Sequence, residues 1–283
     1  MEHILACIDA SVYANSVCDL AAWASARLQL PVELLHVVQR RDAVAARRDL
    51  SGAIGLGVKT DLMEELVRLE ESEAKLQVER GRVLLAAGRD RLQQAGAAEV
   101  RTLHRHGGIV ETILEREADA RLVVMGKRGA GHEFAAAHIG SKIERVVRAS
   151  DRPILIASRT VEPSREVVLA YDASPAADRA LDRLRGSPLF AQVPVHLVMA
   201  EAEDEAHRHA LEAAEATLAA THPVRSTLRR GKAEQVIADI VAQTPGAMLV
   251  MGAYGHSPLR TLIVGSTTAA MIRTVHVPVL LVR

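Results

Sequence analysis

Short apolar runs alternate with longer amphipathic stretches along the whole chain. The apolar runs, about four to seven residues each, lack the strict alternation of a half-exposed strand, which predicts strands covered on both faces. Strands that alternate with helical patterns indicate parallel βαβ units with right-handed crossovers. We expect strands at residues 3–8, 31–38, 99–105, 121–126, 153–157, 166–171, 194–200, 224–229, 247–252 and 278–282.

The pattern occurs twice. "HILACIDAS" (3–11) is matched by "EVVLAYDAS" (166–174), in each case an apolar strand, Asp-Ala-Ser and then a helix. Residues 123–158, which begin "VVMGKRG", are matched by residues 249–283, which begin "LVMGAYG". Because both pairs follow the same order, the sequence predicts a duplicated α/β domain, each copy with a five-stranded parallel sheet and helices on both faces.

A polar stretch that contains proline, "SRTVEPSRE" at 158–166, separates the last strand of the first copy from the first strand of the second. We therefore place the domains at 1–159 and 164–283. The 283-residue length suits two globular units.

The first copy carries an insertion, 39–98, between its second and third strands. Leu62, Leu66 and Leu69 recur there at helical spacing among charges, which predicts an amphipathic helix. We favour a stripe that faces the core of the domain over one that faces a partner. The glycine-rich "GAIGLGVKT" (52–60) is similar to a phosphate-binding P-loop, but Val58 stands where that motif needs lysine, so we interpret it as a flexible loop.

Composition narrows the classes of partner. Thirty-five basic residues balance thirty-five acidic ones and aromatic residues make up 2%, so a nucleic-acid partner is not expected. No stretch reaches the roughly 18–20 apolar residues of a membrane span, and the start has no basic flank, so we expect a cytoplasmic protein without membrane contact. Cys7 and Cys18 indicate neither a disulfide framework nor a metal site, and Cys7, within a strand, is expected to be a buried, inert thiol.

The candidate chemistry lies in "MGAYGHSPLRTLIVGST" (251–267). This stretch follows the fourth strand of its copy, at the carboxyl edge of the sheet where open α/β domains bind ligands. Glycines at 252 and 255 allow backbone to approach a ligand, and Gly265-Ser266-Thr267 then opens a helix whose free N–H groups and hydroxyls suit a phosphate chain.

Asp172 ends the first strand of the same copy and is expected beside this loop. Its carboxylate has two interpretations: it accepts hydrogen bonds from a ribose or an adenine amino group, or, like Ser174, it caps the following helix. We favour the first because of the neighbouring glycines.

The motif Gly252-x2-Gly255-x9-Gly265-Ser266, with Asp172 after the first strand and "VPVLLV" as the last, resembles the ATP-binding universal stress proteins in their tandem form. The resemblance covers nearly the whole chain apart from the insertion. It implies two Rossmann-like domains of the adenine nucleotide alpha hydrolase-like type. It also implies ATP as the cofactor, with or without Mg²⁺.

The resemblance implies these nucleotide-binding positions in the second copy: Ala170, Asp172, Ala200, Met251, Gly252, Gly255, His256, Gly265, Ser266 and Thr267. The glycines and hydroxyls would hold the triphosphate, Asp172 the nucleoside, and Met251 and Ala200 the adenine side. Ala200 is a looser match, because Val37 stands at the corresponding place in the first copy. His256 either reaches phosphate oxygens or is an exposed loop residue.

The first copy departs from the spacing: ten residues rather than nine separate Gly129 from Gly140. Either the extra residue bulges or the turn at Gly129 shifts to Gly131, so we expect a degraded nucleotide site there. The matching positions are Asp9, Val37, Gly126, Gly129, Gly140 and Ser141.

Histidine pairs at 104 and 106 and at 207 and 209 lack a cluster of metal-ligand residues, so we interpret them as solvated surface residues and predict no metal site. No catalytic residue stands out either, because the phosphate cradle has no clear general base and no second carboxylate. We expect a nucleotide-binding regulator with slow hydrolysis at most. The alternatives are an interaction scaffold that acts without nucleotide and, third, a true ATPase or phosphotransferase.

The final strands, "RPILIA" and "VPVLLV", are short, apolar and preceded by proline. The resemblance places them at sheet edges, where unpaired backbone invites a partner strand. We expect the two copies to pair as an intramolecular pseudo-dimer, which allows a further homodimer without requiring one.

Overall fold

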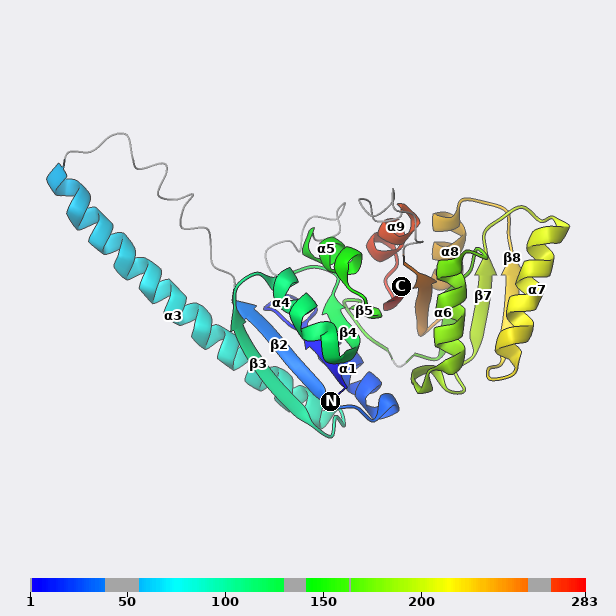
Figure 1. Ribbon diagram of the computed structural model, residues 1–283, viewed down its shortest axis with the longest axis horizontal. Coiled ribbons are helices and arrows are strands. Elements are labelled where there is room, and N and C mark those ends of the chain that lie inside the picture. The colour runs from blue at the N-terminus through cyan, green and yellow to red at the C-terminus, as the bar shows by residue number, and fades with distance from the viewer. Residues whose placement is uncertain (1, 39–55, 130–140, 163, 254–265) are drawn as a thin grey trace.

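The computed structural model describes residues 2–38, 56–129, 141–162, 164–253 and 266–283. Its centre is one ten-stranded sheet with the order β3-β2-β1-β4-β5-β10-β9-β6-β7-β8 (Figure 1). Each half of that order comes from one copy, so the α/β class and the duplicated architecture predicted from the sequence are confirmed.

The elements of the first copy follow the predicted order. They are β1 (His3–Cys7), α1 (Ala14–Leu28), β2 (Val32–Val38), α3 (Leu56–Gln94), β3 (Val100–His106), α4 (Ile109–Arg116), a 3₁₀ turn (Glu117–Asp119), β4 (Ala120–Gly126), α5 (Ser141–Ala149) and β5 (Ile154–Ala157).

The second copy repeats that order without the long insertion. Its elements are β6 (Glu166–Ala170), α6 (Pro175–Gly186), a 3₁₀ turn (Pro188–Phe190), β7 (Val195–Met199), α7 (Glu205–Ala219), β8 (Val224–Leu228), α8 (Ala233–Ala242), β9 (Ala247–Gly252), α9 (Ser266–Thr274) and β10 (Val279–Val282).

The sheet has one apolar layer on each face. Side chains of α1, α3, α6 and α7 belong to one buried cluster, and those of α4, α5, α8 and α9 to the other. Strands β1, β5, β7 and β10 are buried along their whole length, because helices cover both faces. This burial explains why the apolar runs show no period-two alternation.

The two copies join through β5 and β10, which pair antiparallel while the strands within each copy pair parallel. The predicted intramolecular pairing of the last strands is thereby confirmed. Because β5 and β10 run in opposite directions, the strands of the two copies point in opposite directions across the common sheet. The carboxyl ends of the first copy's strands therefore lie at one side of the sheet and those of the second copy's strands at the other.

Helix α3 is 39 residues long, and its two halves have different surroundings. Leu85 and Leu92 are buried in its C-terminal half, and Arg91 donates to Asp19 of α1 at 2.7 and 2.8 Å. Burial of apolar surface stabilises the C-terminal half, which packs near α1, β2 and β3. The N-terminal half projects away from the other described elements (Figure 1).

Two interpretations of the insertion are wrong. Leu66 is half-buried and Leu69 is 55% exposed, so these leucines do not form a core-facing stripe, while the side chain of Leu62 lies outside the described residues. Residues 56–60 of the glycine-rich stretch start α3 instead of forming a flexible loop, and 52–55 lie outside the described residues. The helix was correctly predicted, but the face that contacts the domain was not.

Within the described parts of the chain, no helix is long and apolar enough to cross a membrane.

Candidate functional site

The carboxyl edge of the second copy brings the predicted nucleotide positions together. Ala170 at the end of β6 is paired in register with Met251 of β9. The residues that follow, Asp172 and Gly252, therefore lie at the same edge of the sheet. Ala200, directly after β7, packs against the apolar cluster that contains Ala170 and Met251. The predicted adenine-side positions thus share one apolar surface.

Asp172 is exposed at this edge and also shapes the turn that follows. Its Oδ1 accepts the Ser174 N–H at 3.0 Å, and the Ser174 hydroxyl oxygen accepts the Ala177 N–H at 3.2 Å, which caps α6. Between them Ala173 has a φ of 54°, in the left-handed region that non-glycine residues rarely adopt. Helix capping therefore belongs to Ser174, and Asp172 keeps an exposed carboxylate at the end of a constrained turn.

Gly252 has a packing role that the sequence did not reveal. A Cβ at this position would lie 2.5 Å from the carbonyl carbon and oxygen of Ala176, in the first turn of α6. The next residue, Ala253, donates its N–H to Val282 of β10 at 2.7 Å. Close contact with α6 requires glycine at 252 even without a ligand, and the Ala253 N–H is already engaged.

The other half of the predicted phosphate cradle is the start of α9. Ser266 is exposed and Thr267 is half-buried there, at a helix N-terminus whose first N–H groups have no partner within the helix. The remaining predicted positions, Gly255, His256 and Gly265, lie outside the described residues. The nucleotide-binding roles assigned to this edge stay predictions.

The first copy also brings predicted residues close together. A Cβ on Gly129 would lie 2.9 Å from Oδ2 of Asp9, and one on Gly126 would lie 2.6 Å from the Cβ of Tyr13. Val37 is buried in β2. Ser141 begins α5, and Gly140 lies outside the described residues.

Lys127 and Arg128 fill the two-residue gap between Gly126 and Gly129, and sequence reasoning passed over both. Together with residues of the second copy they line a cavity of about 440 Å³. A signal was present in the sequence: the gap reads Lys-Arg in the first copy and Ala253-Tyr254 in the second.

Histidines gather on β2 and β3. The ring centroids of His36 and His104 are 5.4 Å apart, and those of His104 and His106 are 5.9 Å apart. His104 is half-buried, and burial is the main cause that lowers its pKa, so its interpretation as a solvated residue is wrong. His106 and His209 are exposed as predicted, whereas His207 is half-buried. Within the described ranges, no group of three or more His, Cys, Asp or Glu side chains is placed to hold a metal ion.

Cys7 and Cys18 are buried free thiols, as the sequence predicted for Cys7. Burial raises the pKa of both, that of Cys18 to about 12, so neither forms the reactive thiolate near neutral pH.

Comparison with known proteins identifies relatives along the whole chain. Residues 1–158 and 184–283 match the model of the universal stress protein family. A universal stress protein of Synechocystis sp. is 34% identical over 287 aligned residues, which cover 100% of both proteins. One from Mycolicibacterium smegmatis is 22% identical over 299 residues, covering 99% of this chain and 96% of that protein.

A solved structure shows the same fold. The crystal structure of a universal stress protein from Archaeoglobus fulgidus is similar with a TM-score of 0.73 at 20% identity, and the match covers 99% of this chain and 98% of that one.

Proposed function

Because the chain belongs to the universal stress protein family, we propose that it is an ATP-binding regulator whose second copy holds the nucleotide. The observation that carries this proposal is the arrangement at the carboxyl edge of that copy. The exposed carboxylate of Asp172, the glycine at 252 and the N-terminus of α9 all belong to the edge at which open α/β sheets bind ligands.

In this proposal each part of the edge binds one part of the nucleotide. The free N–H groups and hydroxyls of Ser266 and Thr267 bind phosphate oxygens, with Gly255 and Gly265 completing the cradle. The exposed Asp172 carboxylate accepts from ribose hydroxyls, and the apolar surface of Ala170, Ala200 and Met251 contacts adenine. The bound species is ATP, with or without Mg²⁺.

Bound nucleotide would regulate the protein by changing either the surface that contacts a partner or the oligomeric state. We expect no general base and no second carboxylate beside the predicted phosphate positions of the second copy. Slow hydrolysis at most is therefore part of the proposal. So are the domain boundaries, 1–159 and 164–283, and a cytoplasmic location.

Direct nucleotide analysis tests the proposal. The purified full chain is denatured, the released small molecules are separated by chromatography, and ATP affinity is then measured by calorimetry. Asp172→Asn keeps an amide oxygen for the Ser174 N–H and should weaken ATP binding roughly tenfold or more, as expected when a charge-assisted hydrogen bond is lost.

Asp9→Asn is the matched control, because Asp9 makes the same turn contact with Ser11 in the first copy, and it should leave the affinity unchanged. The absence of both released nucleotide and a thermal shift with added ATP would overturn the proposal.

A second candidate function, a scaffold that acts without nucleotide, is favoured by the exposed face of α3. Leu69, Leu76 and Val83 are 55%, 49% and 61% exposed and recur every seven residues, the repeat of a coiled-coil seam. Glu73 and Arg80 alternate with them along the same stripe. In a parallel pair of α3 helices Glu73 would face Glu73 and Arg80 would face Arg80, whereas in an antiparallel pair Glu73 would face Arg80. The occupant that fits this stripe is therefore α3 of a second copy in antiparallel orientation.

The oligomeric state tests this second candidate. Light scattering after size exclusion should show a dimer with and without ATP, and Leu76→Glu should convert it to a monomer. Lys75→Glu, at an exposed position of α3 away from this stripe, should remain dimeric. A monomeric wild-type chain would exclude the homodimer.

A further inference from the structure

The cavity of about 440 Å³ lies where the two copies meet, at the carboxyl edge of the first copy. Its lining includes Tyr13, Lys127, Arg128, Arg159, Arg273 and His276. The first copy contributes the start of α1 and the loops after β4 and β5, and the second contributes the end of α9 and the loop before β10. Its size is within the range of small-molecule sites.

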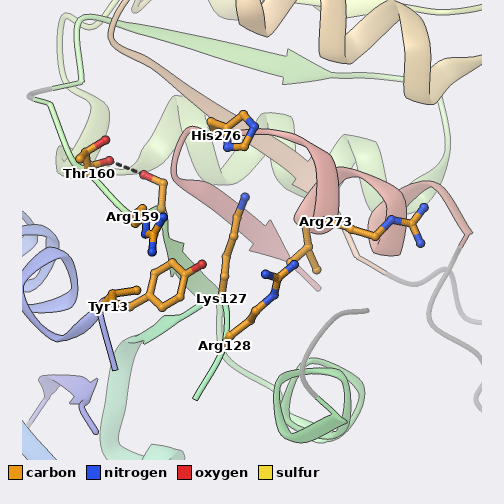
Figure 2. Close-up of a pocket in the computed structure, with 10 residues that line it drawn as sticks. Tyr13, Lys127, Arg128, Arg159, Thr160, Arg273 and His276 are labelled. Atoms are coloured by element: carbon orange, nitrogen blue, oxygen red, sulfur yellow. Dashed lines mark hydrogen bonds between the residues drawn. The ribbon is translucent and has the colours of Figure 1, made fainter. Parts of the chain in front are cut away.

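Positive charge is concentrated in this cavity. Figure 2 shows Lys127 between Arg159 on one side and Arg273 on the other, with its ammonium directed toward His276. Arg128 adds a fourth cation, and the described lining residues include no carboxylate. Since the whole chain has a formal net charge of zero, this concentration is local and does not reflect a generally basic protein.

Among these cations, Lys127 gives the strongest reason to expect a bound anion. It is only 9% exposed, and its ammonium donates to the backbone carbonyl of Val275 in the second copy. None of the ion pairs among the described residues includes Lys127, Arg159 or Arg273. A buried ammonium without an opposite charge is costly, so a bound anion would remove a penalty that the folded chain carries.

We propose that this cavity binds a small polyanion of the polyphosphate class. Arginine guanidinium groups match phosphate oxygens bidentately and the lysine supplies a compact point charge, so several phosphate groups can be engaged together. A volume of about 440 Å³ is large for a single phosphate. Tyr13 and His276 carry the rings among the described lining residues, beside four cationic side chains, so recognition rests chiefly on the phosphates.

The site is separate from the ATP site proposed in the second copy. The antiparallel pairing of β5 with β10 places the carboxyl edges of the two copies at opposite edges of the sheet. The cavity lining also excludes Asp9, Val37 and Gly129 of the first copy's predicted nucleotide site. The inference therefore does not depend on the proposed function.

Calorimetric titration of the full chain with inorganic tripolyphosphate tests the proposal. The wild type should bind, and Arg273→Gln and Lys127→Met should each raise the dissociation constant roughly tenfold or more, as for a lost charge-assisted hydrogen bond. Arg208→Gln, which removes an exposed arginine from α7, is the matched control and should bind like the wild type. Because Arg273 is exposed, its variant keeps the test valid even if Lys127→Met fails to fold.

Further arms identify the ligand class. Asp172→Asn should leave tripolyphosphate binding intact, which separates this cavity from the ATP site. Citrate and single phosphate should bind much more weakly than tripolyphosphate. Absence of tripolyphosphate binding, equal binding of citrate, or an affinity unchanged by both Lys127→Met and Arg273→Gln would each overturn the proposal.

Discussion

Leu280 of β10 lies opposite Leu155 of β5 in the antiparallel ladder that joins the two copies, and both side chains are buried. Either leucine replaced by alanine should lower the free energy of unfolding by about 2–5 kcal/mol, because a cavity opens in a packed core. Denaturation in urea measures the effect.

The double variant of Leu155 and Leu280 should lower the free energy of unfolding by less than the sum of the two single variants. We expect a difference of about 0.5–3 kcal/mol, because the two side chains face each other. The control pair combines Leu155→Ala with Leu218→Ala on α7, which packs beside β8, the last strand of the sheet and five strands away from β5, and its effects should be additive. If the two single effects on the free energy of unfolding simply added for Leu155 and Leu280, the two side chains would not be coupled across the junction.

Gly252→Ala should destabilise the chain whether or not nucleotide is present. The new Cβ would meet the Ala176 backbone at 2.5 Å, and backbone cannot move aside as a flexible side chain can. Thermal unfolding of the nucleotide-free protein measures the loss, which we expect at about 1–3 kcal/mol.

Gly186→Ala is the matched control for Gly252→Ala. It lies at the end of α6 with no atom within 4 Å of the added Cβ, so it should leave stability unchanged or raise it by about 0.5–1 kcal/mol. If Gly252→Ala were equally harmless, the packing role of this glycine would be wrong.

Ala173→Gly should stabilise the second copy by roughly 1 kcal/mol, because glycine adopts a φ of 54° without the steric penalty that alanine carries. The first copy supplies the control. Ala10 occupies the equivalent place between Asp9 and Ser11 and is not among the residues with positive φ, so Ala10→Gly should destabilise slightly. Measured by denaturant unfolding, Ala173→Gly should raise the free energy of unfolding and Ala10→Gly should lower it. Changes of the same sign in the two variants would refute this explanation.

Stability should rise between pH 8 and 10.5 because of Lys127. Burial, and to a smaller degree the charge of Arg128, lower the pKa of Lys127 from 10.5 to about 8. Within that window the unfolded chain binds more protons at this residue than the folded chain, so unfolding becomes less favourable as pH increases. Below pH 8 the full penalty applies, roughly 3 kcal/mol for a shift of this size.

Lys127→Met should remove this contribution, so the difference in stability between the two proteins should shrink as pH rises through the window. Lys75→Met, on the exposed half of α3, should keep the wild-type slope. Parallel curves for the wild type and Lys127→Met, measured by urea denaturation across the range, would show that Lys127 is not desolvated. Saturating tripolyphosphate should flatten the wild-type slope as well, since a bound anion restores the ammonium's pKa.

The candidate sites show where sequence reasoning succeeds and where it fails. Asp172 and Met251 were placed at one edge of the sheet because parallel strands bring their carboxyl ends together, and the register of β6 and β9 agrees. The contact of Gly252 with Ala176 was not predicted, since nothing local distinguishes a glycine that faces a helix from one that faces a ligand. Leu69 was assigned to the core because helical spacing reveals a stripe without revealing what covers it.

The duplication and the order of strands and helices are readable in the amino-acid sequence, because local apolar periodicity and repeated motifs depend on neighbours along the chain. The pairing of the two copies through their last strands was expected from the family resemblance. Only the tertiary structure decided which half of α3 is covered, which glycine is required by packing, and that the Lys127 ammonium meets the Val275 carbonyl 148 residues away. Desolvation and close packing depend on contacts between distant segments, and a buried cation becomes recognisable only when its surroundings are assembled.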